Sequence, residues 1–90
     1  MAQAAADPAE IRRFAGALRR FVQDMQQQTL QMRSQMQNLG QSWRDQEYQK
    51  FVDEYEQALV VFGRMLDHAE EFVPFLTRKA DRVEEYLQQR

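Results

Sequence analysis

The sequence contains no cysteine and only one histidine, His68. Disulfide bonds and thiolate metal sites are therefore excluded, and no second histidine or cysteine exists to complete a metal site or a nucleophile pair. The sequence also lacks a glycine-rich phosphate loop and the acid pair of a general acid and base. We therefore expect no catalytic, metal-binding or cofactor-binding residue, and no enzymatic activity.

Long apolar runs are also missing, since no stretch approaches the ~18 residues that a membrane span requires. Residues 1–6 have neither the charged nor the apolar region of a cleavable signal peptide. We expect no membrane insertion, and a protein that is cytoplasmic or is secreted without a cleavable signal. Glycine and proline are scarce while glutamine is abundant, which favours long helices over sheets.

The first half of the chain has the pattern of one long helix over residues 8–39, after a flexible lead at residues 1–6. Asp7 followed by Pro8 is typical of a helix N-terminus. Apolar residues then recur at steps of three and four in two series. Thr29 is needed to connect the two series, and the phase of the pattern shifts there. The series are Ile11, Phe14, Leu18, Phe21 and Met25, then Met32, Met36 and Leu39.

Residues 40–42 have the composition of a tight turn between two helices. Gly40 suits the left-handed conformation that ends a helix, and Ser42 with Asp45 has the spacing of a capping box. We expect the second helix to span residues 43–88, with the Trp43 ring at its start, wedged between the two helices.

The second half has an unbroken pattern of five heptads, typical of a coiled-coil seam. Its members are Val52, Tyr55, Leu59, Phe62, Leu66, Ala69, Val73, Leu76, Ala80, Val83 and Leu87. Further apolar residues lie beside this seam, and one neighbouring helix cannot cover them as well. These residues predict a face for a dimer or another partner: Phe51, Ala58, Val61, Met65, Phe72 and Phe75.

Pro74 interrupts neither the heptads nor their phase, so the pattern predicts one helix that is kinked near Pro74. If the helices fold back near Trp43, Ile11 meets the second helix near residue 75. Residues 76–90 would then overhang the first helix.

Charge is divided unevenly between the two halves. Residues 8–44 hold six arginines against two acidic residues, whereas residues 45–90 hold eleven acidic against six basic residues. Arginines 12, 13, 19 and 20 form a basic strip, but the net charge is −2. We therefore expect the strip to pair with an acidic helix and not with nucleic acid. Together these features predict an all-α fold, a single antiparallel helical hairpin over residues 1–90 that pairs into a four-helix bundle dimer.

The central residues Leu39-x-x-x-Trp43-x-Asp45-x-x-Tyr48-x-x-Phe51 resemble the bend of the WXG family of type VII (ESX-type) secretion. The resemblance implies a hairpin that forms a homodimer, or a heterodimer with a related helical hairpin. It implies a role as a secreted substrate, or as a carrier or adaptor for a larger effector. The turn motif comprises Gly40, Ser42, Trp43, Asp45, Tyr48 and Phe51.

The chain departs from the family pattern at two points. Asp45 stands where the motif has glycine, so we expect Gly40 and Ser42 to build the bend. The family's export tag places Asp or Glu four residues after Tyr, whereas Tyr86 is followed by Arg90, so export would depend on a partner's tag. The alternative function is a cytoplasmic coiled-coil adaptor or chaperone-like subunit whose second apolar line covers a client helix.

Overall fold

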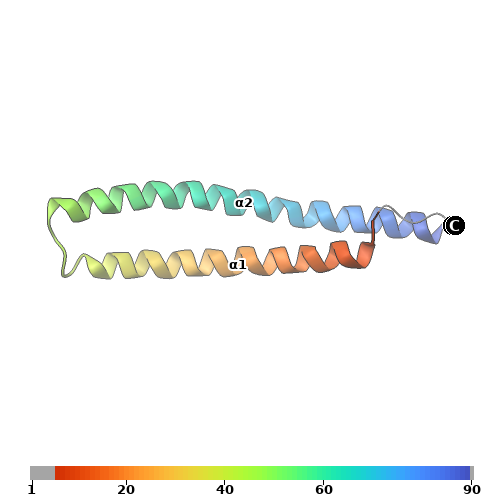
Figure 1. Cartoon of the computed structure of the whole chain (residues 1–90), viewed down its shortest axis with the longest axis horizontal. Coiled ribbons are helices and arrows are strands. Elements are labelled where there is room, and N and C mark those ends of the chain that lie inside the picture. The colour runs from red at the N-terminus through yellow and green to blue at the C-terminus, as the bar shows by residue number, and fades with distance from the viewer. Residues whose placement is uncertain (1–5, 90) are drawn as a thin grey trace.

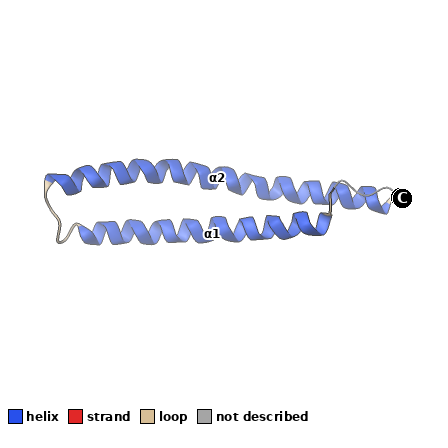
Figure 2. Cartoon of the chain, viewed as in Figure 1, coloured by secondary structure: helices blue, strands red, loops and turns tan. Residues whose placement is uncertain are grey.

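Two long antiparallel helices joined by a short turn make up the computed structural model, which describes residues 6–89 (Figure 1). Helix α1 spans Pro8–Leu39 and helix α2 spans Gln46–Gln88. The described residues contain no strand (Figure 2), and the molecule measures 69 × 17 × 16 Å. The predicted all-α antiparallel hairpin is therefore confirmed.

Helix α1 begins with the cap that the sequence predicts. The Asp7 side chain accepts a hydrogen bond from the Ala9 backbone N–H at 2.9 Å, and Pro8 is the first helical residue. This satisfies one of the free N–H groups of the first turn, and proline has none to satisfy. The flexible lead expected at residues 1–6 lies, apart from Ala6, outside the described residues.

The connection between the helices is longer than predicted, and two details of the prediction are wrong. Asp45, not Ser42, caps α2, and the helix begins at Gln46 instead of residue 43. Gly40 has φ −63°, so it is right-handed and not left-handed. The Ser42 hydroxyl instead donates to the Leu39 carbonyl at 3.3 Å, which closes the end of α1. Ser42 therefore forms its hydrogen bond with the end of α1 and not with the start of α2.

The core is a single seam between the two helices. Every residue of the predicted α2 seam is buried or partly buried, and Leu66, Val73 and Ala80 are the most deeply buried. We label the heptad positions of both helices a to g, with these three residues at position a. In this labelling the e and g positions lie on opposite sides of the seam.

The predicted seam of α1 is wrong at two aromatic residues, and two of its other members, Met32 and Leu39, are 48% and 42% exposed. Phe14 and Phe21 are 59% and 53% exposed, whereas Ala15 and Val22 are buried in their place. Steps of seven from Ala15 lead to Thr29 and Met36, but steps of seven from Phe14 lead to two glutamines. Burying those glutamines without partners is unfavourable. The face of α1 that packs against α2 is therefore shifted by one residue from the predicted face. With Val22 in the seam, the phase shift expected at Thr29 disappears.

The start of α1 lies farther along α2 than predicted. Arg12 forms ion pairs with Asp81 and Glu84, so the overhang beyond α1 is shorter than residues 76–90. Side chains lean toward the N-terminus of their own helix, so on antiparallel helices an arginine and a glutamate lean in opposite directions. Their charged groups can therefore meet although their Cα atoms lie several residues apart along the helix axes. Helix α2 continues through Pro74, as predicted; the kink there stays a prediction.

Candidate interaction surfaces and the turn between the helices

Asp45 connects the turn to the first residues of α2. Its Oδ1 atom accepts a hydrogen bond from the Tyr48 backbone N–H at 3.1 Å and another from the Trp43 indole Nε1–H at 2.8 Å. One carboxylate thus caps the helix and fixes the orientation of the indole ring. The predicted capping box joined Asp45 to Ser42 and did not include this double role.

Tyr48 and Gly40 join the two helices at the closed end. The Tyr48 hydroxyl donates to the Met36 carbonyl of α1 at 2.8 Å. A Cβ atom at Gly40 would lie 2.7 Å from that hydroxyl oxygen and 2.9 Å from the ring carbon that bears it. A side chain at this position would displace the Tyr48 ring, so glycine is favoured by the close approach of Tyr48 and not by backbone conformation.

Aromatic rings continue from the turn along the first turns of α2. Trp43 is half-buried and meets Tyr48 edge to face, with ring centroids 5.3 Å apart. It also stacks on Phe51 at 6.0 Å, and Phe51 lies 5.7 Å from Tyr55. The structure therefore brings together the motif residues Trp43, Asp45, Tyr48 and Phe51, while Ser42 and Gly40 contact α1 and Tyr48 respectively.

One side of the hairpin is an exposed apolar surface, which we call the apolar flank. The predicted partner face of α2, at its g and c positions, is exposed at all six residues. The two phenylalanines excluded from the α1 seam occupy g positions on the same side. The apolar flank consists of Phe14, Phe21, Phe51, Ala58, Val61, Met65, Phe72 and Phe75.

A groove of about 400 Å³ opens beside this flank, in the half of the hairpin nearer the turn. Its walls are mostly apolar, and they include the small side chains of Thr29 and Ala58. The lining residues are Met25, Gln28, Thr29, Met32, Tyr55, Ala58, Leu59 and Phe62. The groove has room for apolar side chains that this chain does not itself supply.

The opposite side of the hairpin carries ion pairs from e positions of α1 to e and b positions of α2, and we call it the charged flank. Arg33 pairs with Glu56 at 2.5 Å, and Arg12 pairs with Asp81 at 2.9 Å and with Glu84 at 2.5 Å. Hydrogen bonds to Asp81 and Glu84 raise the pKa of Arg12 above its ordinary value. The opposite charges of the two halves of the sequence therefore attract within one chain.

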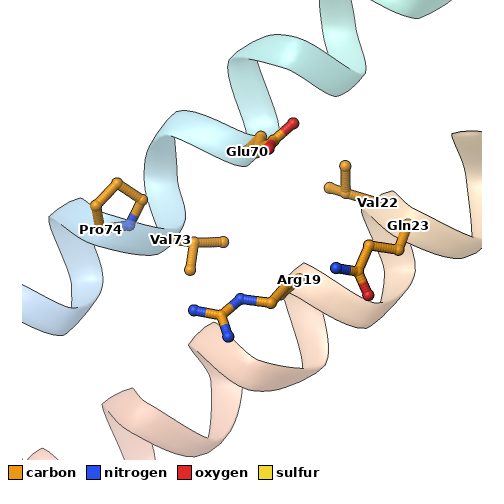
Figure 3. A pocket seen from close by; sticks show the side chains of 6 residues that line it. All are labelled: Arg19, Val22, Gln23, Glu70, Val73 and Pro74. Carbon is orange, nitrogen blue, oxygen red and sulfur yellow. The ribbon is translucent and has the colours of Figure 1, made fainter.

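A hollow of about 240 Å³ lies between these ion pairs on the charged flank (Figure 3). Val22 and Val73 point into the gap from the two helices, and Arg19, Gln23, Glu70 and Pro74 complete its lining. Proline lacks an N–H group, so Pro74 cannot donate to the Glu70 carbonyl one turn earlier. Among the residues that the structure describes, Arg19 and Glu70 form no ion pair with each other.

Outside these surfaces the described residues show little that could support catalysis. His68 is exposed, 3.5 Å from the Glu71 carboxylate and beside the Phe72 ring. In residues 6–89 no three His, Cys, Asp or Glu side chains are grouped closely enough to hold a metal ion. Neither described helix is long and apolar enough to cross a membrane.

The antiparallel hairpin, and the Trp43 motif at its bend, agree with a family comparison. The family model WXG100, described as proteins of 100 residues with WXG, matches residues 3–86. The chain belongs to the WXG100 family. No curated protein and no solved structure matches the chain.

The WXG100 motif of this chain is altered at its third position, and the structure explains how the change is accommodated. Asp45 occupies the N-cap of α2, a position at which both glycine and aspartate are favourable. Aspartate adds a side-chain acceptor, which here binds the helix N-terminus and the Trp43 indole. The substitution therefore preserves the bend.

Membership of WXG100 also places the chain in a functional class. WXG100 proteins are small, non-enzymatic helical proteins secreted by type VII systems, and they commonly form dimers. The two-helix architecture of this chain is the one that the resemblance implied.

Proposed function

We propose that this WXG100 protein is a non-enzymatic interaction module of a type VII-like secretion system. It acts as a secreted substrate, or as a carrier or adaptor for a larger effector. It pairs through the apolar flank with a second copy of itself or with a related helical hairpin, forming a four-helix bundle. Tyr86 is followed four residues later by arginine instead of Asp or Glu, and we expect the partner hairpin to supply the export signal.

The observation that carries this proposal is the exposed apolar flank. The chain exposes 7340 Å², whereas a compact monomer of its mass would expose about 5,500 Å². Covering a large apolar side chain contributes roughly 1.5 to 3 kcal/mol, and several such side chains lie on this one side. Monomeric proteins rarely leave so large an apolar surface in water.

Two adjacent valines provide a matched test of which flank pairs. Val61 belongs to the apolar flank and is 65% exposed, while Val60 lies on the other side of α2 and is 52% exposed. Val61→Glu should abolish pairing with the partner hairpin, because pairing would bury an unpaired carboxylate. Val60→Glu should leave pairing intact. Light scattering of each variant, alone and co-expressed with a related hairpin, measures the mass of the assembly.

Equal loss of pairing in both variants would show that the apolar flank is not the interface. Because both positions are exposed in the monomer, neither change should disturb the hairpin itself, and far-ultraviolet circular dichroism of each variant checks this.

Export is tested separately, in cells that carry a type VII machine. The chain should reach the medium when its partner is present, and should remain inside cells that lack the membrane ATPase of the machine. Retention of both chains in cells with an intact machine would argue against the substrate role.

The groove of about 400 Å³ favours one alternative, a cytoplasmic adaptor or chaperone-like subunit that binds a client helix. Such a client would occupy the same flank, so Val61→Glu would prevent its binding as well. The two functions differ in export, since the alternative requires no secretion machine.

A further inference from the structure

We infer that the charged flank docks a second partner, which is a single amphipathic helix of a larger protein. This helix has an apolar stripe with basic residues along one edge and acidic residues along the other. The inference rests on the proposed function, in which the chain carries a larger effector. It assigns the apolar flank to the partner hairpin and the charged flank to the effector.

Arg19 and Glu70 occupy the positions of an ion pair that the hairpin does not form. Arg33 and Glu56 occupy e positions of the two helices and lie 2.5 Å apart. Two heptads farther from the turn, the same positions in the same register hold Arg19 and Glu70. In the part of the chain that the structure describes, neither of these two residues forms an ion pair. Both charges are therefore available to groups outside the chain.

The hollow of about 240 Å³ takes the place of this ion pair (Figure 3). Val22 and Val73 make it apolar inside, and the Arg19 side chain extends along it toward Pro74. Because proline has no N–H group, the Glu70 carbonyl lacks its usual helical donor and can accept a hydrogen bond from a partner. The hollow thus offers space for an apolar side chain, with a group of either charge beside it.

Apolar side chains continue from the hollow toward the turn. Leu30 and Val60 are 66% and 52% exposed at b positions, on the side of the charged flank. Between them and the hollow lies Gly63, where nothing occupies the space within 4 Å of a Cβ position. From Val60 to Val73 helix α2 rises about 20 Å, which is the length of a helix of about 14 residues. The charged flank therefore has an open apolar strip long enough for one docked helix.

Opposite charges border this strip on its two sides. The α2 side carries Asp67 and Glu70, and the α1 side carries Arg19 and Arg20. The Arg20 guanidinium belongs to this side because a Cβ atom at Gly16, a b position, would lie 3.7 Å from its Nη1 atom. A complementary helix has basic residues toward α2 and acidic residues toward α1. Since reversing a helix in a groove exchanges its two edges, the charges also fix its direction.

A double-mutant cycle tests whether Arg19 and Glu70 are free of one another. Arg19→Gln and Glu70→Gln should change the unfolding equilibrium constant independently, in the single variants and in the double variant. The matched cycle of Arg33→Gln and Glu56→Gln should show a coupling of about two- to fivefold. Urea unfolding at one protein concentration measures both cycles. Equal coupling in the two cycles would show that Arg19 and Glu70 pair within the chain, and would overturn the inference.

A synthetic helix tests docking directly. The probe is a fluorescent peptide of about 16 residues, with a leucine stripe, lysines along one edge and glutamates along the other. It should bind the paired chain, and a second peptide with glutamine at every edge position should bind about tenfold more weakly. Fluorescence anisotropy measures both dissociation constants. Failure of the charged peptide to bind, or equal affinity of the two peptides, would overturn the inference.

Two adjacent glutamates locate the bound peptide. Glu70→Lys should weaken binding of the charged peptide about tenfold, because it places like charges together. Glu71→Lys makes the same change of charge at an f position, away from both flanks, and should leave binding unchanged. Equal effects of the two variants would show that the peptide responds only to net charge, and would overturn the docking site.

Val60 and Val61 separate failure of this inference from failure of the proposed function. Val60→Glu should prevent binding of the charged peptide and leave hairpin pairing intact, whereas Val61→Glu should do the reverse. If pairing is lost in Val61→Glu but the peptide still binds Val60→Glu, the inference is overturned and the proposed function is supported. If the Val61→Glu chain still dimerises and adding Val60→Glu abolishes this, a second copy occupies the charged flank, which overturns the inference.

Discussion

Gly40 and Gly63 differ in what surrounds the position of the missing Cβ atom. At Gly40 that position lies against the Tyr48 hydroxyl, whereas at Gly63 nothing lies within 4 Å. The same chemical change should therefore have opposite effects at the two sites, which makes them controls for one another.

Gly40→Ala should lower the free energy of unfolding by about 1 to 3 kcal/mol, because Tyr48 must move and weaken its hydrogen bond to Met36. Gly63→Ala should raise it by roughly 0.5 to 1 kcal/mol, because alanine favours a helix interior more than glycine does. Urea unfolding of both variants at one protein concentration measures the two changes. Equal stabilities would show that the contact of Gly40 with Tyr48 is not tight.

Asp45 provides a second prediction at the residue scale. Asp45→Ala should lower the free energy of unfolding by about 1 to 2 kcal/mol, because the N-terminus of α2 loses its cap. Asp45→Gly, which recreates the family motif, should cost only a few tenths of a kcal/mol for the cap. Chemical unfolding measures both, and Trp43 fluorescence reports the indole, which loses its hydrogen-bond partner in either variant. A glycine variant as unstable as the alanine variant would argue that the indole contact, not the cap, is the larger contribution.

At the scale of the helices, Arg33 shows how a basic residue can lie at the edge of the seam. Its guanidinium pairs with Glu56, yet its Nε atom is buried without a hydrogen-bond partner. The ion pair therefore recovers only part of what burial of the guanidinium costs.

Arg33→Met should change the free energy of unfolding by less than about 1 kcal/mol or should raise it, since methionine fills a similar volume without an unpartnered donor. Glu56→Ala should be the more destabilising change, because it leaves the guanidinium partly buried and unpaired. Thermal unfolding at low and high salt compares the two variants. A large loss on Arg33→Met would show that the ion pair contributes more than its exposure suggests.

The sequence predicted which segments are helical better than it predicted the rotation of each helix about its own axis. On α2 one apolar line was available, so the predicted seam is confirmed throughout. On α1 two lines share Ile11, Leu18 and Met25, and the neighbouring aromatic residues favoured the wrong one. Hydrophobicity alone assigned Phe14 and Phe21 to the seam, but packing along the whole helix decides against them, because their line continues into glutamines.

At the scale of the whole molecule, an elongated hairpin of 69 × 17 × 16 Å has little interior of its own. Much of the stability of such a chain then depends on its partner, and self-association makes the melting temperature depend on concentration.

A tenfold dilution should lower the melting temperature of the unmodified chain by about 2 to 4 °C, as expected for a dimer of this size. The melting temperature of the Val61→Glu variant should be lower and independent of concentration. Differential scanning calorimetry over a hundredfold range of concentration measures this. A melting temperature of the unmodified chain that does not vary would indicate a folded monomer.

Sequence alone determined the fold class, the bounds of α1 and the seam of α2, because heptad spacing and helix-terminal residues act locally along one chain. It also identified six exposed apolar residues on one face of α2, since one helix cannot cover two apolar lines. Tertiary structure decided the rest. The roles of Gly40 and Asp45 depend on where Tyr48 and Trp43 lie in space, and the two flanks of the hairpin arise only when α1 takes one rotation against α2. Such features depend on contacts between distant residues, which local patterns do not specify.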